Sequence, residues 1–77
     1  MDAKLREAKL AKLIESEGYG TLEEMAEAIV SDSVSPAICV EPGCDYTTEM
    51  EPDQDAGYCE ACGNNTVQSA LVLAQII

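Results

Sequence analysis

The 77-residue chain contains no histidine, no tryptophan and no phenylalanine, and its only aromatic residues are three tyrosines. Histidine is the commonest general base in enzymes, and it ionises near physiological pH without help from its surroundings. Its absence excludes Ser-His and Cys-His nucleophilic pairs and every zinc site that needs an imidazole ligand. We therefore expect the protein to act by binding and not as an enzyme.

Positive charge is also scarce, with 4 Lys and Arg against 15 Asp and Glu and a formal net charge of -11. Affinity for a phosphate backbone comes mainly from Lys and Arg side chains that displace condensed counterions. The acidic balance therefore argues against nucleic-acid binding. An isolated contact strip near the amino terminus is the one arrangement that would allow it; the four basic residues there are Lys4, Arg6, Lys9 and Lys12.

The chain has no apolar run of the length that a signal peptide or a membrane span requires. Its first residues alternate charge with Ala and Leu, and the longest apolar run, residues 70–74, is far shorter than the roughly 18 residues of a span. We expect a soluble, cytoplasmic protein without membrane contact. So short a chain also buries little apolar surface, which predicts support from a disulfide, a metal or a partner subunit.

The amino-terminal part of the chain predicts two helices. Asp2 can cap a first helix over residues 3–17, and Thr21 with Glu24 forms a capping box that begins a second helix ending near residue 30. The apolar positions of the second helix share one face; they are Leu22, Met25, Ala26, Ile29 and Val30. The first helix has a narrower stripe of Leu10, Leu13 and Ile14. We expect residues 1–31 to form a helical hairpin and residues 32–36 to form a linker.

The four cysteines form two close pairs, Cys39 with Cys44 and Cys59 with Cys62. In a reducing compartment such pairs are more often metal ligands than disulfides. Four thiolates suit Zn(II), and gaps of two to four residues between ligands are typical of structural zinc sites. The Pro-Gly dipeptide inside the first pair and Gly63 after the second supply tight turns that direct both sulfurs of a pair at one ion. The spacing predicts one structural zinc ion per chain, bound by all four cysteines.

Residues 37–67 resemble the zinc ribbon family, most specifically in the second knuckle, which reads CEACGN from Cys59. The first pair departs from the usual CxxC of the family by two extra residues. The chain is also similar to small bacterial or phage-encoded zinc-ribbon proteins of no assigned activity. The resemblance implies two metal-binding loops, each followed by short antiparallel strands. Together with the helices, it predicts a small α+β fold in which a helical hairpin packs on a three-stranded zinc ribbon spanning residues 37–77.

Short strands are expected at residues 46–50 and 66–68, whereas the tail, residues 69–77, has no clear period. The tail fits either a strand or a short helix capped by Ser69, and we favour a strand that passes into a buried tail. Its apolar side chains need cover from the helices in one shared core; they are Leu71, Val72, Leu73, Ile76 and Ile77. If the helices do not cover them, the tail predicts a weak homodimer in place of a monomer.

The predicted ribbon is crowded with acids, namely Glu41, Asp45, Glu49, Glu51, Asp53, Asp55 and Glu60. This charge favours an acidic protein-protein interaction or adaptor module whose partner has a basic surface. Two alternatives stay open. Many zinc ribbons are nucleic-acid-associated, transcription-linked regulators, and four thiolates can also hold iron in a rubredoxin-like electron carrier. Rubredoxin-like proteins have two CxxC knuckles and aromatic residues around the metal, whereas this chain offers only Tyr46 and Tyr58 nearby.

Overall fold

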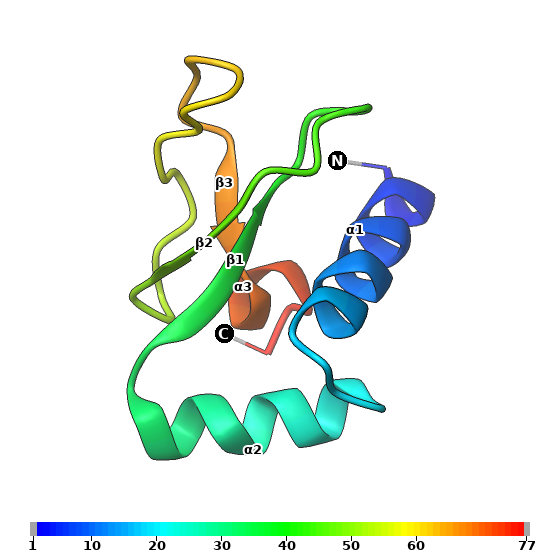
Figure 1. Cartoon of the computed structure of the whole chain (residues 1–77), viewed down its shortest axis with the longest axis vertical. Coiled ribbons are helices and arrows are strands. Elements are labelled where there is room, and N and C mark those ends of the chain that lie inside the picture. The colour runs from blue at the N-terminus through cyan, green and yellow to red at the C-terminus, as the bar shows by residue number, and fades with distance from the viewer. Residues whose placement is uncertain (1, 77) are drawn as a thin grey trace.

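A computed structural model describes residues 2–76 of the chain. Two helices come first and a three-stranded antiparallel sheet follows, which confirms the predicted small α+β fold (Figure 1). The elements in chain order are α1 (Ala3–Ser16), α2 (Leu22–Asp32), β1 (Ser35–Cys39), β2 (Thr47–Met50), β3 (Val67–Ser69) and α3 (Ala70–Leu73). The strand order is β2-β1-β3. Among the described residues, no helix is both long enough and apolar enough to span a bilayer.

Both predicted helix starts are confirmed by their capping contacts. The Asp2 side chain accepts a hydrogen bond from the backbone N–H of Lys4 at 3.3 Å, and the Thr21 hydroxyl accepts one from the N–H of Glu24 at 3.2 Å. The Glu24 carboxylate accepts from the N–H of Gly20, one residue before the cap, at 3.1 Å. The helix continues to Asp32, and Val30 is 78% exposed, so the expected apolar face of α2 was wrong at that position.

The central strand β1 occupies part of the segment expected as a linker, and all five of its residues are buried. It contains Pro36, although a central strand forms hydrogen bonds with a neighbouring strand on each side and proline has no N–H to donate. The N–H of Cys39 points toward β2, so by alternation the backbone nitrogen of Pro36 points toward β3. Proline is tolerated at this position because no β3 residue needs its missing N–H. Strand β3 has already ended there, and the N–H of Ala70 donates to the Ser35 hydroxyl at 3.1 Å.

The structure of residues 69–76 contradicts the strand predicted for the tail. Strand β3 ends at Ser69, whose hydroxyl accepts from the N–H of Val72 at 3.2 Å and begins α3. A strand would send alternate side chains of this unbroken apolar run to solvent, whereas one helical turn buries most of them together. Ile76 is 53% exposed, so the prediction that the helices bury this side chain was wrong. Ile77 lies outside the described residues.

Two apolar clusters form on the two faces of β1, because successive side chains of a strand point to opposite faces. The first joins the three helices to the sheet; its buried members are Leu13, Met25, Ile29, Ile38, Ala70, Leu71 and Leu73. The second contains two of the four cysteines; its buried members are Ala37, Cys39, Cys59 and Val67. Strand β1 contributes to both clusters, so it connects the helical core to the cysteines.

Candidate metal centre

Each cysteine pair lies in a loop that joins two antiparallel segments. Cys39 is the last residue of β1, and Cys44 lies in the loop that leads to β2. Cys59 and Cys62 lie in the loop closed by an antiparallel bridge between Gly57 and Val67. The two loops therefore present their sulfurs from neighbouring positions at the same end of the sheet.

The first loop folds as a tight turn over residues 41–44. The N–H of Cys44 donates to the carbonyl of Glu41 at 3.1 Å, and Gly43 between them has a φ of 83°. Proline followed by a positive-φ glycine is the signature of a type II turn, in agreement with the turn predicted from the Pro-Gly dipeptide. This turn takes up the two residues by which the pair exceeds a CxxC spacing.

The second loop directs backbone donors at its first sulfur. The N–H of Cys62 points at the Sγ of Cys59 at 3.3 Å, and the N–H of Gly63 donates to the carbonyl of Cys59 at 2.8 Å. Gly63 has a φ of 78°, the left-handed conformation predicted from its place after the pair. An amide that points at a sulfur stabilises the thiolate form that binds a metal.

The four sulfurs form a compact group. Cys39 Sγ lies 3.8 Å from Cys62 Sγ, and Cys44 Sγ lies 3.7 Å from Cys59 Sγ, with all four within 4.8 Å of one another. A disulfide would need a separation of about 2.05 Å, and all four cysteines are free thiols. A regular tetrahedron of sulfurs at about 2.3 Å from a central ion has edges of about 3.8 Å. The cysteines are therefore positioned to hold a metal ion.

The surroundings act differently on two of the thiols. Burial opposes ionisation of Cys39, but hydrogen bonds from the Thr66 hydroxyl at 3.1 Å, from the Glu41 backbone and from neighbouring thiols outweigh it and lower its pKa to about 7. The neighbouring thiol of Cys44 and burial raise the pKa of Cys62 above its ordinary value. The position of Thr66 was not predicted, since its hydroxyl reaches Cys39 only through the pairing of two segments distant in sequence.

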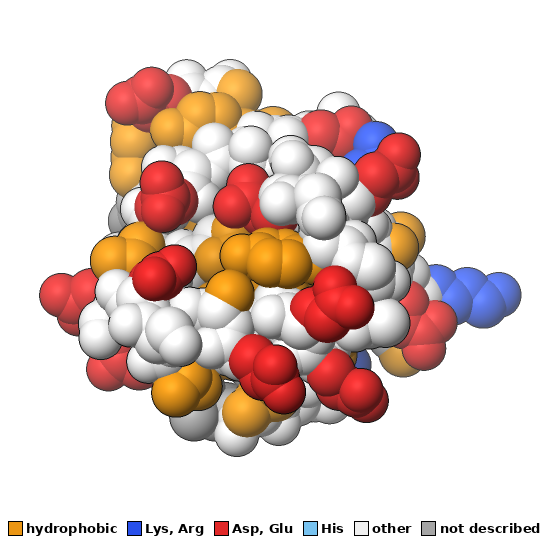
Figure 2. Space-filling model, turned by 60° about the horizontal axis from the view of Figure 1, so that its bottom comes forward, with side chains coloured by type: hydrophobic (Ala, Val, Ile, Leu, Met, Phe, Trp, Pro, Cys, Tyr) orange, Lys and Arg blue, Asp and Glu red, His pale blue; other side chains and the backbone are white. Residues whose placement is uncertain are grey.

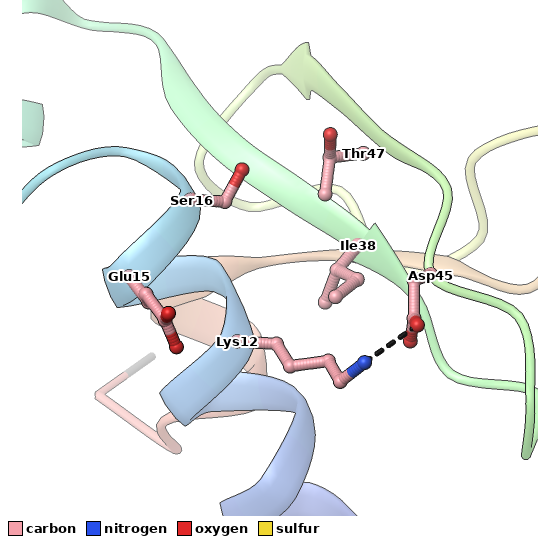
Figure 3. A pocket seen from close by; sticks show the side chains of 6 residues that line it. All are labelled: Lys12, Glu15, Ser16, Ile38, Asp45 and Thr47. Carbon is pink, nitrogen blue, oxygen red and sulfur yellow. Dashed lines mark hydrogen bonds and ion pairs between the residues drawn. The ribbon is translucent and has the colours of Figure 1, made fainter.

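Two lysines of α1 reach the first cysteine loop, which sequence reasoning missed. Lys9 is 3% exposed, and its ammonium donates to the carbonyl of Cys44 and lies 3.6 Å from a carboxylate oxygen of Asp45. Lys12 is exposed and bonds the other oxygen of that carboxylate at 2.6 Å (Figure 3). Hydrogen bonding to Lys12, with the charge of Lys9 nearby, holds the pKa of Asp45 below its usual range. Lys9 lies four residues before Leu13, a spacing that places both on the buried face.

We expect Gly63→Ala to destabilise the protein by about 1–2 kcal/mol, because an L-residue in the left-handed region brings its Cβ too close to the following carbonyl oxygen. The nearest atom to the new Cβ would be the Tyr58 hydroxyl at 4.0 Å, so crowding adds nothing. Urea unfolding of the metal-loaded protein measures the loss.

The control for that substitution is Gly20→Ala, which makes the same chemical change at a residue without a positive φ. Its new Cβ would meet the Glu24 carboxylate at an ordinary distance of 3.5 Å, so little change in stability is expected. An equal loss of stability from the two substitutions would show that the left-handed conformation of Gly63 does not contribute to the stability of the protein.

No protein-family model matches this chain, and neither a curated protein nor a solved structure is significantly similar to it.

Proposed function

We propose that the protein is a small zinc ribbon in which one structural Zn(II) holds the two cysteine loops together and in which an acidic surface binds a partner protein. The arrangement of the four sulfurs carries this proposal, since sulfur separations of 3.7 and 3.8 Å fit one tetrahedral ion. Zinc is favoured over iron by the surroundings, because only Tyr46 and Tyr58 supply aromatic rings in this half of the chain.

A site of four cysteines supports a structural and not a catalytic metal. Four thiolates complete the tetrahedral coordination of zinc, which leaves no position for a substrate or for an activated water. When bound, the ion would supply a fixed crosslink between the two loops. The chain's own residues would orient the ligands through the turn at Gly43, the amide of Cys62 and the hydroxyl of Thr66. We infer that the protein acts by binding another macromolecule.

The charge distribution supports a protein partner over a nucleic acid. Of the four basic residues, Lys9 is buried and Lys12 is paired with Asp45, so the contact strip considered from the sequence is broken. Figure 2 shows one face of the molecule with acidic side chains spread across it and basic side chains only at its margin. With a net charge of -11, such a surface attracts a basic partner at long range and repels phosphates.

We expect the zinc-loaded protein to bind a lysine-rich peptide, with an affinity that falls as salt rises from about 50 to 500 mM, because added salt screens exposed charges. Duplex DNA should give no shift in a mobility assay even at low salt. Fluorescence anisotropy of the labelled peptide measures the first binding, and the same protein stock serves for the second.

The matched control for this binding is the metal-free chain, which carries the same acidic side chains without the ordered ribbon. The proposal expects it to bind the lysine-rich peptide at least tenfold more weakly. Equal binding by the two forms would show that charge alone, and not a folded module, attracts the peptide. Binding of duplex DNA would favour the nucleic-acid alternative.

A further inference from the structure

The outer edge of β2 carries unpaired backbone groups. Cys39 donates its N–H to the carbonyl of Tyr46, so the bonded pairs between β1 and β2 fall at every second residue along the register. By this alternation Thr47 and Glu49 direct their N–H and C=O groups away from β1. Over residues 2–76, no other strand pairs with β2 on that side, and no backbone hydrogen bond to another part of the chain engages these two residues.

The opposite edge of the sheet is covered, in contrast to β2. Gly57 and Val67 exchange two backbone hydrogen bonds of 2.8 and 2.9 Å along the outer side of β3. The N–H of Ser69 on the same side donates to the carbonyl of Gln54 at 3.2 Å. The chain thus protects one edge of its sheet with its own loop and leaves the other available for pairing with an additional strand.

Hollows flank β2 on both faces of the sheet. On the helix side, a hollow of about 430 Å³ lies between α1 and the sheet (Figure 3); its lining is Lys12, Glu15, Ser16, Ile38, Asp45 and Thr47. On the other side, a second hollow of about 430 Å³ lies beside β2; its lining includes Tyr46, Thr48, Glu49, Met50, Tyr58 and Glu60. A strand added along β2 would direct its side chains alternately to the two faces, and therefore toward both hollows.

The lining of these hollows fits cationic side chains. Glu15 lines the hollow on the helix side, and Glu60 lines the hollow on the other side. Glu49 borders the second hollow, but alternation along β2 places its side chain on the same face as Thr47, toward the helices. None of these three carboxylates forms an ion pair within residues 2–76. Tyr58 is 59% exposed, and its ring offers a face on which an Arg or Lys can rest. A second copy of this chain fits poorly, because pairing two β2 edges would bring a second set of carboxylates, Glu15, Glu49 and Glu60, against the first.

We propose that the β2 edge binds an extended segment of the partner protein, which carries Lys or Arg at consecutive positions and adds to the sheet as a fourth strand. This inference rests on the proposed function and names its partner's chemistry. Backbone hydrogen bonds to Thr47 and Glu49 supply the pairing, and the two hollows receive the cationic side chains. Strand addition of this kind gives affinity through the main chain and specificity through the pockets on either side.

The test uses the zinc-loaded full chain and three peptides of seven residues each. The first carries Lys in adjacent pairs among Thr and Val, the second has Glu in place of Lys, and the third is the first with N-methyl groups on alternate backbone amides. The proposal predicts binding of the first peptide, at least tenfold weaker binding of the third, and none of the second. In two-dimensional NMR, the amides of Thr47 and Glu49 should shift most and gain protection from hydrogen exchange.

Two substitutions at Glu49 separate pairing from charge. Glu49→Pro removes the outward N–H at a position where an edge strand accepts proline, and it should weaken binding of the lysine peptide at least tenfold. Glu49→Gln keeps that N–H and removes one charge. It should therefore weaken binding of the lysine peptide only a few-fold and make the binding less sensitive to salt. A circular dichroism spectrum and zinc content equal to those of the parent show that Glu49→Pro is folded; if it is not, the N-methylated peptide decides.

The outcomes distinguish this inference from the function on which it rests. Salt-sensitive binding of the lysine peptide that is indifferent to N-methylation and to Glu49→Pro would overturn strand addition and leave the acidic module intact. Shifts confined to residues away from β2 would also overturn it. Failure of the folded, zinc-loaded protein to bind any lysine peptide would overturn the proposed function and this inference together.

Discussion

Removing the metal is expected to unfold the sheet. Zinc binding to four-ligand sites in peptides has an apparent free energy of about 10–16 kcal/mol, and in small metal-stapled domains it contributes directly to folding. Here β1 carries Cys39 for the metal centre and Ile38 for the helical core, so loss of the metal should also loosen the packing of the helices. A strong chelator, added with a reductant to prevent disulfides, should collapse the dispersed amide NMR spectrum, and added zinc should restore it.

The same result is expected from Cys59→Ser, because the site then has three thiolates and a hydroxyl that binds zinc poorly. Cys59 is fully buried beside Cys39 and Val67, so its loss also disturbs the second cluster. Ala61→Ser is the matched control, since Ala61 is exposed in the same loop and is not one of the four thiols. A native-like amide spectrum for Cys59→Ser without bound metal would contradict a metal-dependent fold.

Replacing Lys9 with methionine is expected to cost about 2 kcal/mol of stability, the contribution of a hydrogen bond from a charged donor. Methionine preserves the length and the apolar stem of the side chain but removes the ammonium that bonds the carbonyl of Cys44. Because that carbonyl belongs to a candidate ligand, zinc affinity should also fall by about 10- to 100-fold, as for other groups that orient ligands. Competition with a coloured zinc chelator measures the affinity.

Lys12→Met is the matched control, one helical turn away on the same helix. Lys12 is 57% exposed in its pair with Asp45, and exposed ion pairs contribute little to stability. Its loss should leave zinc affinity close to that of the parent and reduce stability much less than the loss of Lys9. An equal effect of the two substitutions would show that the buried contact with the first cysteine loop has no special role.

The features that depend on short stretches of sequence were predictable. Helix caps such as Asp2 and Thr21 act over three residues, and the structure confirms both. The pairing of the cysteines was predictable for the same reason, because ligand gaps and adjacent glycines are local features, and the structure brings all four sulfurs together. Local chemistry thus accounts for most of the candidate site.

The features that depend on tertiary contacts were not predictable. Ser69 fits a strand and a helix cap equally well, and the chain turns there because α3 can bury Leu71 and Leu73 in the helical core. In the sequence, Lys9 is one of four basic residues that are all expected to be solvent-exposed. Its burial follows from the position of the first cysteine loop beside α1, which only the structure shows. Pro36 argues against a central strand unless the early end of β3 is known. Each depends on a segment distant in sequence.

X-ray absorption at the zinc edge of the purified, zinc-loaded protein tests the central claim most directly, because it reports the ligand atoms around the ion and their distances. One ion held by Cys39, Cys44, Cys59 and Cys62 predicts four sulfur neighbours at about 2.3 Å and no oxygen or nitrogen in the first coordination sphere. A first sphere with fewer than four sulfurs, or with oxygen or nitrogen ligands, would contradict it.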